Sequence, residues 1–188
     1  MDSLSDNALM LQVKDGQLDK LGLLFERYNK NLYGFFYRLT LDQEQSEDLV
    51  QSVFLRILKY KHSYHGDGKF STWMYHMARN LFADHYKKNK KMGFKESPEM
   101  ADKYFSNDRN AETDRIQSEE LDLLQQAMNQ LSFEKREVLV LSKLQEMRYK
   151  DIAEVLGINE NAVKVRIFRA LKDLKAEYLR LEKGSIAN

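Results

Sequence analysis

The chain has 188 residues, enough for one medium domain or two small ones, and a net charge of +1. It contains no cysteine, which excludes disulfides, thiol catalysis and thiolate zinc sites. No apolar run approaches the roughly 20 residues of a membrane span, and the N-terminus lacks the basic start and long apolar core of a signal peptide. One proline and eight glycines, among many Leu, Glu, Lys and Gln, predict an all-α protein.

Three helices are predicted in the first third of the chain. Their expected ranges are about 6–16, 18–39 and 42–60. Ser5 or Asp6 caps the first helix, and Asp42 caps the third, where Gln45 would complete a capping box. The acidic residues that open the third helix either stabilise its dipole or form a docking surface for a protein partner.

A short loop and a fourth helix follow, rich in aromatic and basic residues. In the loop, residues 64–69, Gly66 and Gly68 supply backbone freedom, and Ser71 is the expected N-cap of the helix. The spacing i, i+3, i+4, i+7 predicts a buried apolar face, made of Phe70, Trp73, Met74, Met77, Ala78, Leu81 and Phe82. The expected outer face comprises Thr72, Tyr75, His76, Arg79, Asn80, Tyr86, Lys87 and Lys90. Such a face can stack on unpaired bases and contact phosphates, or it is simply a solvated basic face.

Helical periodicity fails over residues 93–118, which predicts a flexible acidic linker between two domains, 1–92 and 119–188. Charge supports this division, because residues 96–134 hold three Lys or Arg against ten Asp or Glu. The flanking segments are basic, with ten against six over 41–95 and twelve against eight over 135–188. Chance clustering on solvated helices is the alternative.

The second domain contains a helix-turn-helix pattern, preceded by two helices of which Ser132 caps the second. A short helix from Tyr149 meets a turn at Gly157, and Asn159 opens the next helix. The predicted shared core consists of Ile152, Ala153, Leu156, Ile158, Val163, Val165 and Ile167. The second helix would present Asn161, Lys164, Arg166, Arg169 and Lys172 to solvent or to DNA. A purely structural helical hairpin is the alternative.

Together, the two halves resemble the extracytoplasmic-function group of bacterial RNA polymerase sigma factors over nearly the whole chain. The family's second conserved region is similar to DQEQSEDLVQSVFLRILK (42–59) and FSTWMYHMARNLFADHYKK (70–88), and its fourth region to residues 131–175. The resemblance implies two small helical domains, an N-terminal bundle and a C-terminal helix-turn-helix bundle. It also implies a cytoplasmic, non-enzymatic promoter-recognition subunit with no cofactor and no metal. The implied partners are core RNA polymerase, double-stranded and single-stranded promoter DNA, and an anti-sigma factor. The free chain would be a monomer without membrane insertion.

The resemblance further implies three sets of site residues. For the minus-ten element, where the loop would hold a flipped base, they are Tyr64, His65, Gly66, Asp67, Lys69, Tyr75, His76, Arg79, Asn80, Tyr86, Lys87 and Lys88. For the major groove of the minus-thirty-five element they are Asn161, Lys164, Arg166 and Arg169. For polymerase they are Glu47, Asp48, Leu49, Gln51 and Phe54.

Two other functions fit parts of the sequence. A stand-alone helix-turn-helix DNA-binding regulator explains the second domain, but it leaves the acidic start of the third helix without a role. The helix-turn-helix also resembles the output domain of response regulators, although residues 1–95 contain nothing similar to a phosphoacceptor domain.

A metal enzyme would draw on the histidines of one short segment, His62, His65, His76 and His85. No second group of metal ligands accompanies them in the sequence.

Overall fold

The computed structural model describes residues 4–91 and 111–186, with side chains over 4–86 and 120–184. Every regular element in these ranges is helical, which confirms the predicted all-α class. The elements are α1 (Asp6–Lys14), α2 (Lys20–Thr40), α3 (Gln43–Tyr60), η1 (Lys61–Ser63), α4 (Phe70–Lys91), α5 (Ala111–Asn129), α6 (Phe133–Leu139), η2 (Val140–Leu144), α7 (Tyr149–Leu156) and α8 (Glu160–Ile186). None of the helices in these two ranges is both long and apolar enough to cross a membrane.

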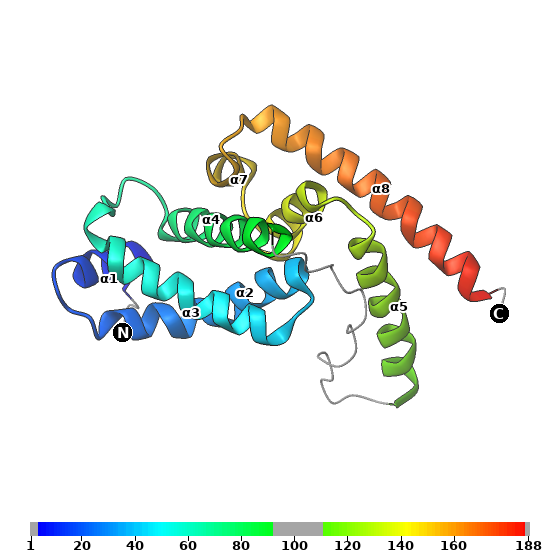
Figure 1. Ribbon diagram of the computed structural model, residues 1–188, viewed down its shortest axis with the longest axis horizontal. Helices are drawn as coiled ribbons and strands as arrows, with labels where there is room; N and C mark the ends of the chain where they lie inside the picture. The colour runs from blue at the N-terminus through cyan, green and yellow to red at the C-terminus, as the bar shows by residue number, and fades with distance from the viewer. Residues whose placement is uncertain (1–3, 92–110, 187–188) are drawn as a thin grey trace.

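Helices α1 to α4 form a bundle, which we call the N-terminal half. Helix α3 packs between α2 and α4, and α1 contacts both α2 and α4 (Figure 1). The predicted apolar stripes meet in its core, because apolar residues at helical spacing all point to one side of a helix. The fully buried members are Leu9, Met10, Val13, Leu24, Leu32, Phe35, Phe36, Val53, Ile57, Met74 and Ala78.

The predicted helix starts of this half are confirmed at two positions and wrong at a third. The Ser5 hydroxyl accepts from the Ala8 N–H at 3.3 Å, and Asp42 Oδ1 accepts from the Gln45 N–H at 2.9 Å. The Asp42 N–H donates to the hydroxyl of Thr40, so the capping box forms only in part. Helix α4 starts at Phe70, and Ser71 therefore lies inside the helix instead of capping it.

Helices α5 to α8 form the C-terminal half, in which α5, α6 and α7 all pack on α8. Helix α5 begins at Ala111, inside the segment predicted as a linker, because Ala, Glu, Arg and Gln favour a helix even without an apolar stripe. The helix-turn-helix is present in α7 and α8. Its turn residue Gly157 has a left-handed φ of 66°, and Asn159 Oδ1 accepts from the Ala162 N–H at 2.8 Å.

One predicted core residue of the helix-turn-helix is wrong. Val165 is 49% exposed, whereas Val163 and Ile167 are buried. Because successive residues of a helix are about 100° apart, Val165 lies on nearly the opposite face from Val163. The inner row of α8 instead continues from Ile167 to Ala170.

The two halves pack directly against each other. Phe82 of α4 stacks on Phe133 of α6, with ring centroids 5.2 Å apart. Helix α4 also contacts α7, and α2 contacts α6 and η2. The buried residues of both halves therefore form one continuous hydrophobic cluster. The long helix α8 runs away from this junction, so the chain ends far from its N-terminus (Figure 1).

Candidate nucleic-acid and polymerase interfaces

The loop between η1 and α4 keeps its polar side chains at the surface. His65, Asp67 and Lys69 are exposed. Gly66 adopts a left-handed φ of 80°, which L-residues with a side chain rarely adopt. Gly68 has no positive φ, so only one of the two predicted glycines supplies special backbone freedom.

Tyr64, predicted to contact DNA, is buried instead. Its side chain is 3% exposed, and its ring packs against Trp73 at 5.0 Å between centroids. Burial, together with the nearby charge of Asp6, raises the pKa of the Tyr64 phenol to about 12. Its place is therefore in the aromatic core under the loop.

The outward face of α4 is partly covered by the C-terminal half. Tyr75 is 3% exposed, and its hydroxyl lies 2.5 Å from Gln145 Oε1 of the C-terminal half. Gln145 also donates to the Asn31 carbonyl at 3.2 Å. Thr72 is 2% exposed. The predicted exposure of Tyr75 and Thr72 is thus wrong, because helical periodicity does not show what else covers a polar face.

Two of the cations predicted to contact DNA form ion pairs with the C-terminal half. Arg79 Nε donates to Glu137 Oε1 at 2.9 Å, and Lys69 pairs with Asp151 of α7. Glu137 is 1% exposed. Burial raises the pKa of its carboxyl, although Arg79 and Arg166 oppose this by favouring the charged form.

The other predicted minus-ten residues vary in exposure. His76 is exposed, and its Nδ1 lies 3.4 Å from Asn80 Nδ2. Tyr86 is 38% exposed and stacks on Phe133 at 6.2 Å between centroids. The side chains of Lys87 and Lys88 lie outside the described residues. The polar side chains that reach the surface here are thus those of His65, Asp67, Lys69, His76, Tyr86 and, in part, Asn80.

Helix α8 presents the predicted polar row near its N-terminus. Asn161, Lys164 and Arg169 are exposed, Arg166 is half-buried, and Lys164 pairs with Glu160 at 3.1 Å. Sequence reasoning missed Phe168, which is 71% exposed on the same helix. Phe168 lies four residues after Lys164, which places both on one face of the helix, and this spacing could have identified it from the sequence.

The α3 surface predicted to contact polymerase is only partly exposed. Glu47, Asp48 and Gln51 are exposed. Leu49 and Phe54 are 4% and 6% exposed and belong to the apolar stripe in the free chain. Leu55 was missed, although it is 66% exposed and follows Asp48 and Gln51 at helical spacing.

The histidine-rich segment does not gather metal ligands. His62 and His65 are both exposed. No group of three His, Cys, Asp or Glu side chains that could hold a metal ion occurs in the part of the chain with described side chains. The geometry therefore gives no support to a metal enzyme.

Comparisons with known proteins agree with this arrangement. Residues 24–92 match the family described as Sigma-70 region 2, and residues 121–174 match Sigma-70, region 4. The ECF RNA polymerase sigma factor SigM of Bacillus subtilis is 32% identical over 157 residues, which cover 84% of this chain and 94% of SigM. The ECF RNA polymerase sigma factor BldN of Streptomyces coelicolor is 30% identical over 175 residues, covering 90% of this chain and 66% of BldN.

Solved structures show the same fold. CnrH, in complex with the cytosolic domain of CnrY, superposes with a TM-score of 0.69 at 23% identity, covering 91% of this chain and 95% of CnrH. The sigma factor RpoE of Bartonella quintana, in complex with the anti-sigma factor NepR, gives 0.68 at 21% identity, covering 85% and 96%. The two matched sigma regions and the SigM relationship show that the chain belongs to the extracytoplasmic-function group of RNA polymerase sigma factors.

Proposed function

We propose that this sigma factor works in the cytoplasm as a monomer and directs core RNA polymerase to promoters with two separate DNA-reading surfaces. The N-terminal half would bind the minus-ten element through loop 64–69 and α4, and the C-terminal half would bind the minus-thirty-five element through α8. The observation that carries the proposal is that each half exposes residues of a predicted DNA-binding set: His65, Asp67, Lys69 and His76 in the first, and Lys164 and Arg169 in the second.

The start of α8 suits the major groove of DNA. Lys164 and Arg169 can donate to phosphates or to guanine O6 and N7, and a good bidentate pair contributes about 1–3 kcal/mol of base discrimination. The exposed ring of Phe168 lies next to Arg169 in the chain and would contact a thymine methyl group. Asn159 caps the helix at the end that enters the groove.

The exposed part of α3 is the proposed polymerase surface. Glu47, Asp48 and Gln51 present carboxylates and an amide there. Leu55 adds an exposed apolar side chain on the same face. A charged rim around an apolar contact is the usual composition of a protein interface.

Binding to core polymerase tests this proposal. Labelled chain is titrated with sigma-free core polymerase, and the complex is then supplied with fragmented genomic DNA and nucleotides. We expect tight binding and transcripts from discrete starts, and we expect Asp48→Lys to weaken binding at least tenfold because it reverses one interface charge. Asp122→Lys is the matched control, since Asp122 is an exposed acid on α5 in the other half. A chain that binds DNA alone but never binds polymerase would instead be a stand-alone regulator.

An anti-sigma factor is the second proposed partner. Its proposed surface is the mainly apolar hollow between α5 and α8, which is lined by Glu120, Leu121, Leu124 and Tyr178 and leaves both leucines exposed. The structure of the sigma factor RpoE with the anti-sigma factor NepR supports a partner of this class. A candidate anti-sigma factor captured from cells must suppress transcription that depends on the unmodified chain. It must not suppress transcription that depends on the double variant Leu121→Asp, Leu124→Asp. A candidate that suppresses both equally would contradict this surface.

A further inference from the structure

Helix α1 holds both ends of loop 64–69 by hydrogen bonds to its backbone. At the far end, Asn7 Nδ2 donates to the Gly68 carbonyl at 2.7 Å, and Asn7 Oδ1 accepts from the Phe70 N–H at 2.8 Å. At the near end, Lys14 Nζ donates to the Tyr64 carbonyl at 2.6 Å. These three bonds join α1 to positions 50 to 63 residues away in the chain.

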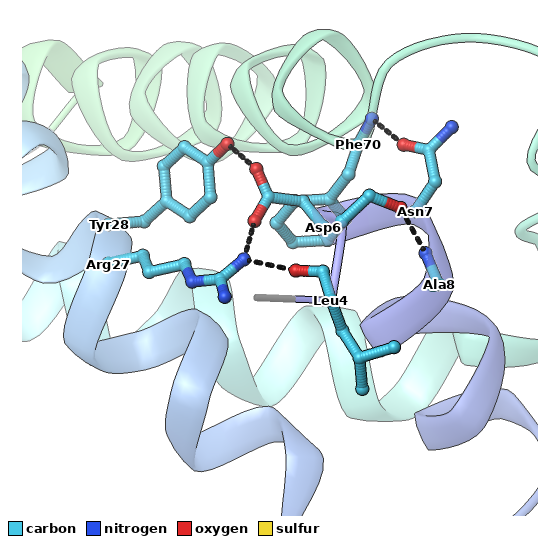
Figure 2. A network of polar contacts seen from close by, with 8 residues as sticks. Leu4, Asp6, Asn7, Ala8, Arg27, Tyr28 and Phe70 are labelled. Carbon is cyan, nitrogen blue, oxygen red and sulfur yellow. Dashed lines mark hydrogen bonds and ion pairs between the residues drawn. The ribbon is translucent and has the colours of Figure 1, made fainter. Parts of the chain in front are cut away.

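The amide of Asn7 is chemically suited to this position. It must donate to a carbonyl with one atom and accept from an N–H with the other, and an amide side chain does both. The Phe70 N–H is the first of α4, so Asn7 also satisfies a donor at a helix start, where N–H groups lack intrahelical partners. Figure 2 shows Asn7 reaching from α1 to the backbone of Phe70.

Separate contacts fix α1 on the bundle. Asp6 Oδ1 accepts from Arg27 Nη1 at 2.6 Å, and Asp6 Oδ2 accepts from the Tyr28 hydroxyl at 2.5 Å. Arg27 also donates to the Leu4 carbonyl at 2.9 Å, which ties the segment that precedes the helix to α2. Figure 2 shows Arg27 and Tyr28 of α2 facing Asp6, and the Tyr28 ring also packs edge-on against Phe70 at 5.5 Å between centroids. The contacts that anchor α1 on α2 therefore use Asp6 and Leu4, whereas those that hold the loop use Asn7 and Lys14.

The middle of the loop rests on α1 while its polar side chains stay exposed. A Cβ placed on Gly66 would meet the side chain of Leu11 of α1 at 3.7 Å. His65 and Asp67, on either side of Gly66, are exposed. Helix α1 thus supports the loop backbone at Gly66, while the side chains of the two neighbouring residues, which carry hydrogen-bonding groups, are exposed to solvent.

We propose that Asn7 is a positioning residue for base recognition, with α1 holding loop 64–69 in the shape that receives the flipped base of the minus-ten element. This rests on the proposed function of the loop. A loop that is ordered before binding loses less conformational entropy on binding, so it binds more tightly and keeps its recognition groups in register. Extruding a base is itself unfavourable, which makes a preformed receiving surface more valuable.

The experiment compares base preference between Asn7 variants. Holoenzyme made with each variant selects from promoter fragments that are randomised at the minus-ten positions of the non-template strand, and bound fragments are sequenced. We expect Asn7→Ala to reduce the preference at one minus-ten position roughly fivefold, the factor that corresponds to about one net hydrogen bond. Asn7→Asp keeps an acceptor for the Phe70 N–H but places a carboxylate oxygen against the Gly68 carbonyl, so it should also reduce this preference.

Asn31→Ala is the matched control, because it makes the same change at an exposed position in the middle of α2. It should leave the minus-ten preference unchanged, and all three variants should keep the minus-thirty-five preference and the affinity for core polymerase. Full minus-ten preference in Asn7→Ala would overturn the inference. Equal losses at both elements would also overturn it, because they would show a general structural role.

A second readout needs neither polymerase nor promoter. Amide hydrogen exchange over residues 64–70 should be faster in the free Asn7→Ala chain than in the unmodified chain, and Lys14→Met should accelerate it as well. Unchanged exchange in both variants would overturn the inference while leaving the proposed function intact. Failure of the unmodified chain to select any promoter would instead overturn the proposed function.

Discussion

At the scale of single residues, two nearby glycines differ in what they contribute to loop 64–69. Gly66 has a φ of 80° and lies against Leu11, whereas Gly68 has ordinary backbone angles and open space around it. We expect Gly66→Ala to lower the free energy of unfolding by about 1–2 kcal/mol through backbone strain. Gly68→Ala is the control and should have little effect. Equal reductions in the free energy of unfolding of the two variants, measured by urea denaturation, would contradict this account.

Glu137 makes the stability of the folded protein depend on pH. Its pKa is raised above the ordinary value of 4.5, mainly because burial disfavours the carboxylate. As the pH rises, Glu137 therefore loses its proton at a higher pH in the folded chain than in the unfolded chain. Since stability falls with rising pH wherever the folded state binds more protons, ionisation of Glu137 destabilises the fold.

The comparison with Glu137→Gln isolates this effect. Gln does not titrate and can still accept from Arg79. We expect the free energy of unfolding of the unmodified chain, relative to Glu137→Gln, to fall as the pH rises above 4.5, the ordinary pKa of a Glu carboxyl. Urea denaturation at several pH values measures it. A difference that rises with pH would mean that the Arg79 pair outweighs the burial of the carboxylate.

Side-chain exposure was predictable where nothing else covers the helix. The polar row of Asn161, Lys164 and Arg169 is exposed as the sequence predicts. Tyr75 is not, because the residue that covers it, Gln145, is 70 positions away in the chain. A periodic pattern identifies a face of a helix, but it does not identify the neighbour that packs on that face.

At the scale of secondary-structure elements, two residues at N-cap positions differ in what their side chains do. The Asn159 side chain accepts from the Ala162 N–H at the start of α8, whereas the Ser132 side chain makes no capping bond at the start of α6. Asn159→Ala should cost about 1 kcal/mol and fray the first turn of α8.

This change should weaken binding to minus-thirty-five duplex DNA, since the first turn carries Asn161. Ser132→Ala is the control and should change neither stability nor binding. Helix content, urea midpoint and DNA affinity of both variants check the expectation. Identical behaviour of the two variants would contradict the assigned cap.

Helix starts were predictable when the cap lies next to its helix. Ser5 and Asp42 precede α1 and α3, and both bond as their sequence context predicts. The start of α4 was not predictable in this way, because the Phe70 N–H is satisfied by Asn7 from another helix. The start of α5 at Ala111 was missed since that first stretch depends on helix propensity without an apolar stripe.

At the scale of the whole molecule, the free chain covers part of the surface that we propose for binding the minus-ten element. The hydroxyl of Tyr75 and the guanidinium of Arg79 contact Gln145 and Glu137, both from the C-terminal half. These groups can reach DNA only after α4 separates from α6 and η2. The sequence predicted two domains, but not this packing, which depends on pairs of residues far apart in the chain.

Binding to core polymerase and promoter DNA should therefore move the two halves apart. Because the chain has no cysteine, Asp19→Cys and Lys175→Cys allow a dye to be attached to an exposed position in each half. We expect energy transfer between the dyes to fall when the complex forms. A pair at Asp19→Cys and Glu44→Cys, both in the N-terminal half, should not change. Unchanged transfer in the first pair would show that the closed packing persists on DNA.

Mapping of transcription starts tests the central claim, that both halves read promoter DNA for polymerase, most directly. Core polymerase, with and without the chain, transcribes fragmented genomic DNA, and the transcript ends are sequenced. The account predicts discrete starts that depend on the chain and share two upstream motifs at a fixed spacing. Starts that are the same without the chain, or that share no motif, would contradict it.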